Sequence, residues 1–175
     1  MAERMVPEKL INFRAYNEGN DLLGVTDIQI PSLDAMTETI KGAGLAGEVE
    51  SPVLGHFGSM ETVLNWRTIS KLGMNLASQK GVNLDLRGAQ QFYDPEKSEY
   101  VVKPVKCVVR GVPKKTELGK LDVGTTSGSS NTIETHYLKV EIDGETMLEI
   151  DKYNYISSIG GVDYLAEVRE ALGLN

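Results

Sequence analysis

Alternation between apolar and polar residues runs through most of this chain and constrains its fold more than any other feature. Along residues 60–67 the two alternating sets are Met60, Thr62, Leu64 and Trp66 against Glu61, Asn65 and Arg67. Residues 82–92 repeat the pattern. Side chains of a β-strand point alternately to opposite faces, so a period of two predicts strands with one buried and one exposed face.

A tight hairpin is predicted in the second half of the chain. Apolar residues alternate over 136–142 and again over 148–150, and Asp143 and Gly144 lie between the two runs. An Asp-Gly pair suits the positive backbone angles of a short turn. After residue 150 the apolar phase shifts, which predicts a bulge near Lys152.

A second hairpin is predicted near the N-terminus, where residues 11–15 and 22–30 flank a turn-rich segment at 17–21. The run 100–110 is apolar on both faces and contains Pro104, which has no N–H to donate to a sheet. We therefore expect this run at a sheet edge or at an irregularity.

One helix is predicted at the C-terminus, because Leu165, Val168 and Leu172 recur at helical spacing. Asp163 is placed to cap its start and Gly173 to end it. Its apolar stripe is expected to pack on a sheet.

The remaining segments complete a mainly β assignment. Residues 70–79 are predicted to form a shorter helix, and the ambiguous run 33–41 is taken as strand from Met36 onward. Strands separated by turns, with a terminal helix, are typical of an antiparallel β-sandwich or barrel. With 175 residues and 41% hydrophobic content, we expect one domain over residues 1–175.

The same composition limits where the chain can function. Its apolar runs are only a few residues long, whereas a membrane-spanning helix needs about 20, so we expect no membrane contact. The N-terminus lacks the apolar stretch of a secretory signal. Cys107 is the only cysteine, which leaves no intramolecular disulfide and favours a reducing cytoplasm. Its expected role is that of a small buried side chain.

Charge is unevenly distributed along the chain. The 18 bases and 25 acids give a formal charge of −7, which argues against a general nucleic-acid-binding surface. Residues 103–120 hold six bases against Glu117, and residues 134–151 hold six acids against Lys139. These two blocks either face each other across subunits or are ordinary solvated strands and loops.

No catalytic, cofactor-binding or metal-binding residues are predicted. Residues 42–47 fit the letters GxGxxG, but no helix is predicted to open there and acidic residues follow, so nucleotide binding is not expected. His56 and His136 belong to no metal-ligand spacing. Asp85 and Glu61 form a conceivable acid and base pair, although nothing in the sequence brings them together.

A glycine-rich arm at about residues 41–58 is the predicted functional feature. Residues 37–58 contain five glycines and Pro52 between two strand-like runs. Glycine raises the entropy lost on ordering, so such an arm must be ordered by something that it lies against, and a second copy of the chain is the natural candidate. The predicted subunit-interface residues are Gly42, Gly44, Leu45, Gly47, Val49, Pro52, Val53, Leu54, His56 and Phe57.

Several stretches, in their order and spacing, resemble the major tail tube protein family of contractile-tailed bacteriophages and of phage-tail-like bacteriocins. They include PEKLINFRAYNEGNDLLGV, MTETIKGAGLAGEVESPVLGHFGSM, LNWRT, LDLRGAQQ, VVRGVPKKTELGKLDVG and DYLAEVREALGLN. The resemblance implies a tail tube fold in which two hairpins of each subunit line a lumen. It also implies hexameric rings that stack into a hollow tube.

The resemblance further implies the partners and the location. They are other copies of the chain, a sheath protein around the tube, and baseplate and tail terminator proteins at its ends. DNA is expected to pass through the lumen without specific binding. The chain is expected in a virion tail, or a tail-like particle, after assembly in the cytoplasm of the bacterial host. Two alternatives remain: a type VI secretion tube subunit, and a monomeric β-sandwich that binds a carbohydrate or a protein.

Overall fold

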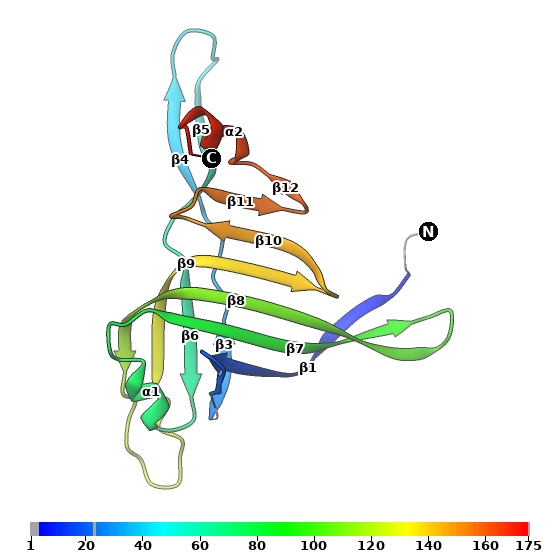
Figure 1. Ribbon diagram of the computed structural model, residues 1–175, viewed down its shortest axis with the longest axis vertical. Helices are drawn as coiled ribbons and strands as arrows, with labels where there is room; N and C mark the ends of the chain where they lie inside the picture. Colours follow the sequence, from blue (N-terminus) through cyan, green and yellow to red (C-terminus); the bar gives the residue numbers. More distant parts are fainter. Residues whose placement is uncertain (1–3, 23, 175) are drawn as a thin grey trace.

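The computed structural model describes residues 4–22 and 24–174, which form twelve strands and two short helices (Figure 1). Their order along the chain is β1 (Val6–Asn17), β2 (Asn20–Asp21), β3 (Val25–Gln29), β4 (Ala35–Lys41), β5 (Glu48–Phe57), β6 (Glu61–Trp66), α1 (Lys71–Asn75), β7 (Val82–Asp94), β8 (Glu99–Glu117), β9 (Ser130–Ile142), β10 (Glu145–Asp151), β11 (Ile156–Ile159), β12 (Val162–Asp163) and α2 (Ala166–Ala171).

One long antiparallel sheet makes up the body of the protein. Its strands follow the order β12-β11-β10-β9-β8-β7-β1-β2, and β6 joins it by pairing with both β9 and β3. The first part of β9 pairs with β6, and its last part pairs with β10. The tip of the β7–β8 hairpin extends beyond the other strands (Figure 1). β4 and β5 form a separate two-stranded sheet that projects from the body.

A bend in β8 allows the long sheet to enclose a core. The register between β8 and β9 shifts at Gly111, where a Cβ atom would lie only 2.1 Å from the carbonyl oxygen of Glu134. Only glycine fits so close to a neighbouring backbone. The core lies between β1, β7, β8 and β9 on one side and β3 and β6 on the other, and includes Ala15, Leu64, Trp66, Leu84, Leu86, Cys107, Val109, Ile133 and Leu138.

Two buried polar pairs lie in the interior. Nε1 of Trp66 donates to Oδ1 of Asn131 over 2.8 Å. The hydroxyl groups of Thr62 and Thr135 lie 2.7 Å apart. Trp66 is thus a core residue, as its apolar neighbours predict, and its indole N–H is satisfied there.

The mainly antiparallel β class is confirmed, and so is the Asp143-Gly144 hairpin, in which Ile142 pairs with Glu145. The prediction of an N-terminal hairpin is only partly correct. β1 turns back into the two-residue strand β2, but β3 crosses to pair with β6. Alternation shows which face of β3 is buried and does not specify its neighbour.

Two details after residue 99 differ from prediction. Residues 152–155 form a turn between β10 and β11 rather than a bulge, and this turn causes the phase shift. β8 is not an edge strand, because β7 and β9 flank it. Pro104 nevertheless lies in the projecting part of β8 that β9 does not reach, so its missing N–H removes no bond to β9.

Both predicted helices are present and short. α1 begins after Ser70, whose hydroxyl accepts from the backbone N–H of Gly73. α2 begins after Leu165, and Gly173 follows it with a φ of 71°. The prediction that Asp163 caps this helix is wrong. Its carboxylate accepts a hydrogen bond from the backbone N–H of Leu165, which precedes α2, and from no backbone N–H within the helix. Within the described part of the chain neither helix is long enough to cross a membrane.

Candidate subunit interface

The glycine-rich segment is one half of a two-stranded arm. β4 and β5 pair from Lys41 and Glu48 near the tip to Ala35 and Phe57 at the base. Strand formation from Met36 onward is confirmed, and residues 48–57 are strand as well. The arm therefore begins at residue 35, before the predicted residue 41, and it is a two-stranded hairpin.

The tip of the arm is a tight turn that requires its glycines. Gly42, Gly44 and Gly47 have φ values of 130°, 92° and 123°, in the region that side chains disfavour. The N–H of Leu45 donates to the carbonyl of Gly42 over 3.2 Å. The GxGxxG letters thus encode a hairpin turn and not the strand-to-helix turn that holds a pyrophosphate.

The two faces of the arm differ in chemistry. Residues opposite each other in an antiparallel pair share a face, so Ile40 and Val49 lie together. The other face carries Thr37 and Glu50, joined by a 2.6 Å hydrogen bond, and the weak pair of Lys41 with Glu48 at 3.7 Å. Ile40 and Val49 are exposed, as are Met36, Leu45, Val53 and Leu54. The arm is amphipathic, and the apolar side chains of Ile40 and Val49 remain exposed beside all the residues that the structure describes.

The base of the arm is fixed to the body. The N–H of Gly58 donates to the carbonyl of Asp34 over 2.8 Å, and the ammonium group of Lys152 donates to the carbonyl of Gly58 over 2.6 Å. The buried side chain of Leu165 lies directly against Gly55. The arm is therefore held at a defined angle by the segment that precedes α2.

The ten predicted interface residues fall into two groups. The turn and the projecting strand hold eight of them, namely Gly42, Gly44, Leu45, Gly47, Val49, Pro52, Val53 and Leu54, and all eight are exposed. His56 and Phe57 are half-buried at the base, where they line a hollow with Ile150 and Leu165. Nδ1 of His56 lies 2.7 Å from the carbonyl oxygen of Leu54. These last two residues anchor the arm within one chain.

β1 presents a free edge that the sequence did not indicate. Among the described residues, its outer edge pairs only at Tyr16 and Asn17, with β2. Its other edge pairs with β7 over almost its whole length. Val6, Leu10 and Ile11 on this strand are about half exposed. An unpaired strand edge with exposed apolar side chains is a site where another chain adds on.

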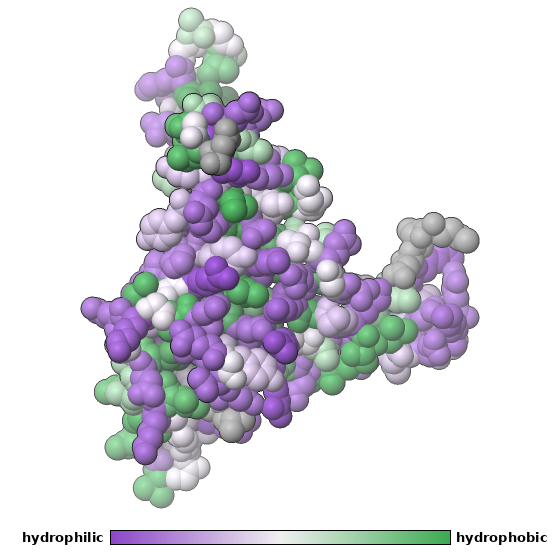
Figure 2. All heavy atoms as spheres, in the orientation of Figure 1, coloured by the Kyte–Doolittle hydropathy of each residue, from purple (hydrophilic) through white to green (hydrophobic). Residues whose placement is uncertain are grey.

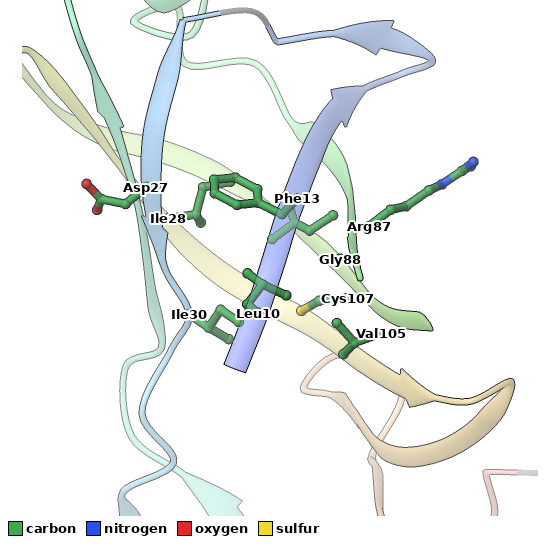
Figure 3. Close-up of a pocket in the computed structure, with 10 residues that line it drawn as sticks. Leu10, Phe13, Asp27, Ile28, Ile30, Arg87, Gly88, Val105 and Cys107 are labelled. Carbon is green, nitrogen blue, oxygen red and sulfur yellow. The ribbon is translucent and has the colours of Figure 1, made fainter. Parts of the chain in front are cut away.

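An apolar cleft of about 250 Å³ lies beside that edge, between β1 and β3 (Figure 3). Leu10 and Phe13 of β1 face Ile28 of β3 and Ile30, which follows β3, and Val105 and Cys107 form the floor of the cleft. Gly88 leaves room for Leu10, since a Cβ there would lie 2.8 Å from its Cδ1. Burial raises the pKa of the Cys107 thiol to about 11, so it is no nucleophile.

The face of the long sheet that points away from the core is polar, and many of its charged side chains form ion pairs. Arg87 binds Asp85 at 2.8 Å, and Lys139 binds Glu141 at 2.8 Å. The guanidinium of Arg110 stacks 4.6 Å over the ring of Tyr137. Hydrophilic residues accordingly cover the sheet in the view of Figure 2.

The basic and acidic blocks meet within one chain, as in the ion pairs of Lys103 with Asp143 and of Lys114 with Glu134. The basic block lies in and just after β8, and the acidic block lies in β9 and β10, so the two meet on neighbouring strands of one chain. Lys114, for example, binds Glu61 at 2.6 Å and Glu134 at 2.7 Å. The hydrogen bonds that the Lys114 ammonium group donates to Glu134 and Glu61 raise its pKa.

The structure does not bring Glu61 and Asp85 together as an acid and base pair. Glu61 lies on β6 and Asp85 lies on β7, and these strands are not neighbours in the sheet. Each carboxylate has its own cation, since Glu61 binds Lys114 and Asp85 binds Arg87. Within the part of the chain that the structure describes, no three His, Cys, Asp or Glu side chains are placed to share a metal ion.

A free sheet edge and an exposed amphipathic arm define a mainly β protein of the kind that associates through its strands. Comparison with known proteins gives the family. The family described as phage tail tube protein FII matches residues 7–173, so the chain belongs to this family of structural tail tube proteins and is not an enzyme.

The chain is also similar to two known proteins, the first in sequence and the second in fold alone. The chain is 28% identical over 173 residues to the tail tube protein of Escherichia phage P2, and the match covers 97% of this chain and 99% of that protein. The sheath/tube terminator of an extracellular contractile injection system, PVC, has a similar fold. Its TM-score is 0.52 at 10% identity, over 77% of this chain and 96% of that one.

Proposed function

We propose that this tail tube protein forms hexameric rings, which stack into a hollow conduit inside a contractile sheath. The observation that carries the proposal is the incomplete strand pairing of the single chain. β1 ends one side of the long sheet with a free edge, and β12 ends the other. A ring closes when β1 of each copy pairs with the opposite end of the sheet in the next copy, which removes both of these free edges.

The polar face of the long sheet lines the lumen in this arrangement. Hairpins β7–β8 and β9–β10 present it. Cations on this face are held by neighbouring groups: Arg87 pairs with Asp85, Lys139 pairs with Glu141, and Arg110 stacks on Tyr137. A passing DNA molecule meets few cations free to neutralise its phosphates, and such neutralisation is what drives nonspecific binding. DNA therefore slides through without adhering.

The arm joins copies of the subunit. A two-stranded hairpin alone is marginally stable in water, and burial of one Val, Leu or Ile side chain contributes about 1.5–3 kcal/mol. The exposed face with Ile40 and Val49 gains this energy only against another copy. Beyond the ring, the partners of the protein are the sheath around the tube and the baseplate and terminator proteins at the ends of the tube. The assembled protein lies in a virion tail and is put together in the host cytoplasm.

Deletion of residues 42–47 tests this function. The deletion removes the tip of the arm and none of the core residues, so we expect a folded chain that no longer polymerises. Purified protein is concentrated and examined by light scattering and negative-stain electron microscopy. Tubes of normal length from the deletion variant, or a strictly monomeric wild type at every concentration, contradict the proposal. The second result favours a monomeric binding module.

A milder pair of variants controls for damage to the hairpin. Ile40→Thr with Val49→Thr makes the apolar face polar and keeps β-branched side chains. Thr39→Val makes the reverse change on the other face. We expect loss of polymer from the first variant and normal tubes from the second. Equal behaviour of the two variants refutes a role for the apolar face.

A further inference from the structure

The end of the molecule opposite the arm carries an apolar surface with a basic border. It is formed by the segment from the end of β6 through α1 and by the loop of residues 118–128 (Figure 1). Leu121 and Val123 are 90% and 100% exposed there. They line a shallow hollow of about 450 Å³ together with Ile69. Met74 and Leu118 are exposed beside it.

The loop is held in this exposed position by a set of backbone hydrogen bonds. The N–H of Ser127 donates to the carbonyl of Arg67 over 2.9 Å, and its hydroxyl accepts from the N–H of Ile69 over 3.0 Å. The N–H of Lys120 donates to the carbonyl of Ser127 over 2.9 Å. Gly119 approaches so closely that a Cβ there would lie 2.0 Å from that oxygen. Leu121 and Val123 therefore protrude from a built loop.

The net charge of this surface is positive. Residues 67–80 carry Arg67, Lys71 and Lys80 and no carboxylate. Arg67 and Lys71 are exposed, and neither forms an ion pair with any residue that the structure describes. Residues 114–128 hold three lysines, and each is paired with a carboxylate: Lys114 with Glu61 and Glu134, Lys115 with Glu117, and Lys120 with Asp122. We call this apolar patch and its bases the basic end.

The arm has the complementary composition. Residues 34–58 hold four carboxylates and one lysine. Glu38 shares the apolar face with Ile40 and Val49, and Glu50 lies on the other face. The arm and the basic end lie at opposite ends of the long axis of the molecule, so they cannot meet within one chain (Figure 1). Hydrophobic residues are visible at both ends in Figure 2.

We propose that the arm of one copy docks on the basic end of a copy in the next ring, which makes stacking polar and directional. The inference rests on the proposed tube function and specifies its axial contact. Leu121 and Val123 meet the apolar face of the arm, and Arg67 and Lys71 meet Glu38 and Glu50. Opposite charges at the border set the register and speed of association, while like charges there cost several kcal/mol.

Charge reversal at one end only gives the test. Arg67→Glu with Lys71→Glu makes both ends of the molecule acidic, and Glu38→Lys with Glu50→Lys makes both ends basic. At about 50 mM salt we expect each variant alone to pellet less than a tenth of the tubes of wild type. An equimolar mixture of the two, and a chain with all four changes, both recover tubes. Salt near 1 M, where the screening length is about 3 Å, weakens the differences.

Lys97→Glu is the control, because Lys97 lies at the tip of the β7–β8 hairpin and away from both ends. It should assemble like wild type. Normal tubes from both reversed variants, or a mixture no better than its components, overturn the docking proposal and leave the tube function intact. A wild type that forms no tubes under any condition refutes the tube function itself.

Discussion

Replacement of Gly55 by alanine is expected to destabilise the fold by about 2–5 kcal/mol, although the residue belongs to a projecting arm. Its φ of 66° lies in the left-handed region, which costs a residue with a side chain about 1–2 kcal/mol. A Cβ there would also lie 2.6 Å from Cγ of Leu165. Leu165 is buried, and forcing an extra carbon into a packed site costs about 1–3 kcal/mol.

Gly44→Ala separates these two contributions. Gly44 has a φ of 92° at the tip of the arm, and a Cβ there meets nothing within 4 Å. Its replacement therefore carries the backbone cost alone, about 1–2 kcal/mol at most, since local fraying of the tip relieves part of the strain. The excess cost of Gly55→Ala over this control measures the contact between the arm and Leu165.

Urea unfolding followed by the fluorescence of Trp66 provides the assay. Trp66 is the only tryptophan and is buried in the core. Measurements are made at a concentration at which light scattering shows a monomer. The double variant Gly55→Ala with Leu165→Ala should cost at least about 1 kcal/mol less than the sum of the single variants, because they share one contact. Equal destabilisation by Gly55→Ala and Gly44→Ala, or strict additivity, refutes the reasoning.

Three further predictions concern the body of the protein. Gly111→Ala places a Cβ 2.1 Å from a backbone oxygen and should cost more than about 3 kcal/mol or prevent folding, whereas Gly81→Ala, with 3.9 Å of clearance, should cost under about 1 kcal/mol in the same urea assay. The hydrogen bond from Arg169 lowers the pKa of Asp163, so its stabilisation is present above about pH 4 and is lost as the pH falls through the lowered value. Between roughly pH 5 and pH 2, the free energy of unfolding should therefore fall less in the Asp163→Asn variant than in the wild type. Cys107, with its pKa raised from 9.0 to about 11, should react with a thiol reagent at pH 8 at least about 100-fold faster after unfolding than before.

Much of the strand content was predictable, because one buried face imposes a period of two. Leu84 and Leu86 on β7 alternate with polar residues in the sequence, and both are buried in the structure. The turn at Asp143-Gly144 was predictable for a different reason, since few residue pairs suit its backbone angles. For the arm, the sequence indicated a glycine-rich segment but not the hairpin turn that Gly42, Gly44 and Gly47 form.

Strand partners and bends were not predictable from this pattern. Nothing in the residues of β3 states that it pairs with β6 rather than β1, because alternation records burial and not neighbours. Gly111 lies in an apolar run, and its contact with the backbone of a strand more than 20 residues later leaves no local signal. The basic end was missed because Leu121 and Val123 stand in a loop, where no period distinguishes a docking side chain from an ordinary one.

The distribution of satisfied and unsatisfied groups determines what kind of assembly this chain can form. Ion pairs on the polar sheet face are complete within one copy, so that face does not require a partner. The incomplete features occur in unlike pairs: β1 at one side of the sheet and β12 at the other, an acidic arm at one end and Arg67 with Lys71 at the other. A two-fold dimer brings each surface against its own copy, acid to acid and base to base. Unlike surfaces are matched only by head-to-tail contacts, which close into rings across the sheet edges and extend without limit along the axis. A tube is the form that satisfies both pairs at once.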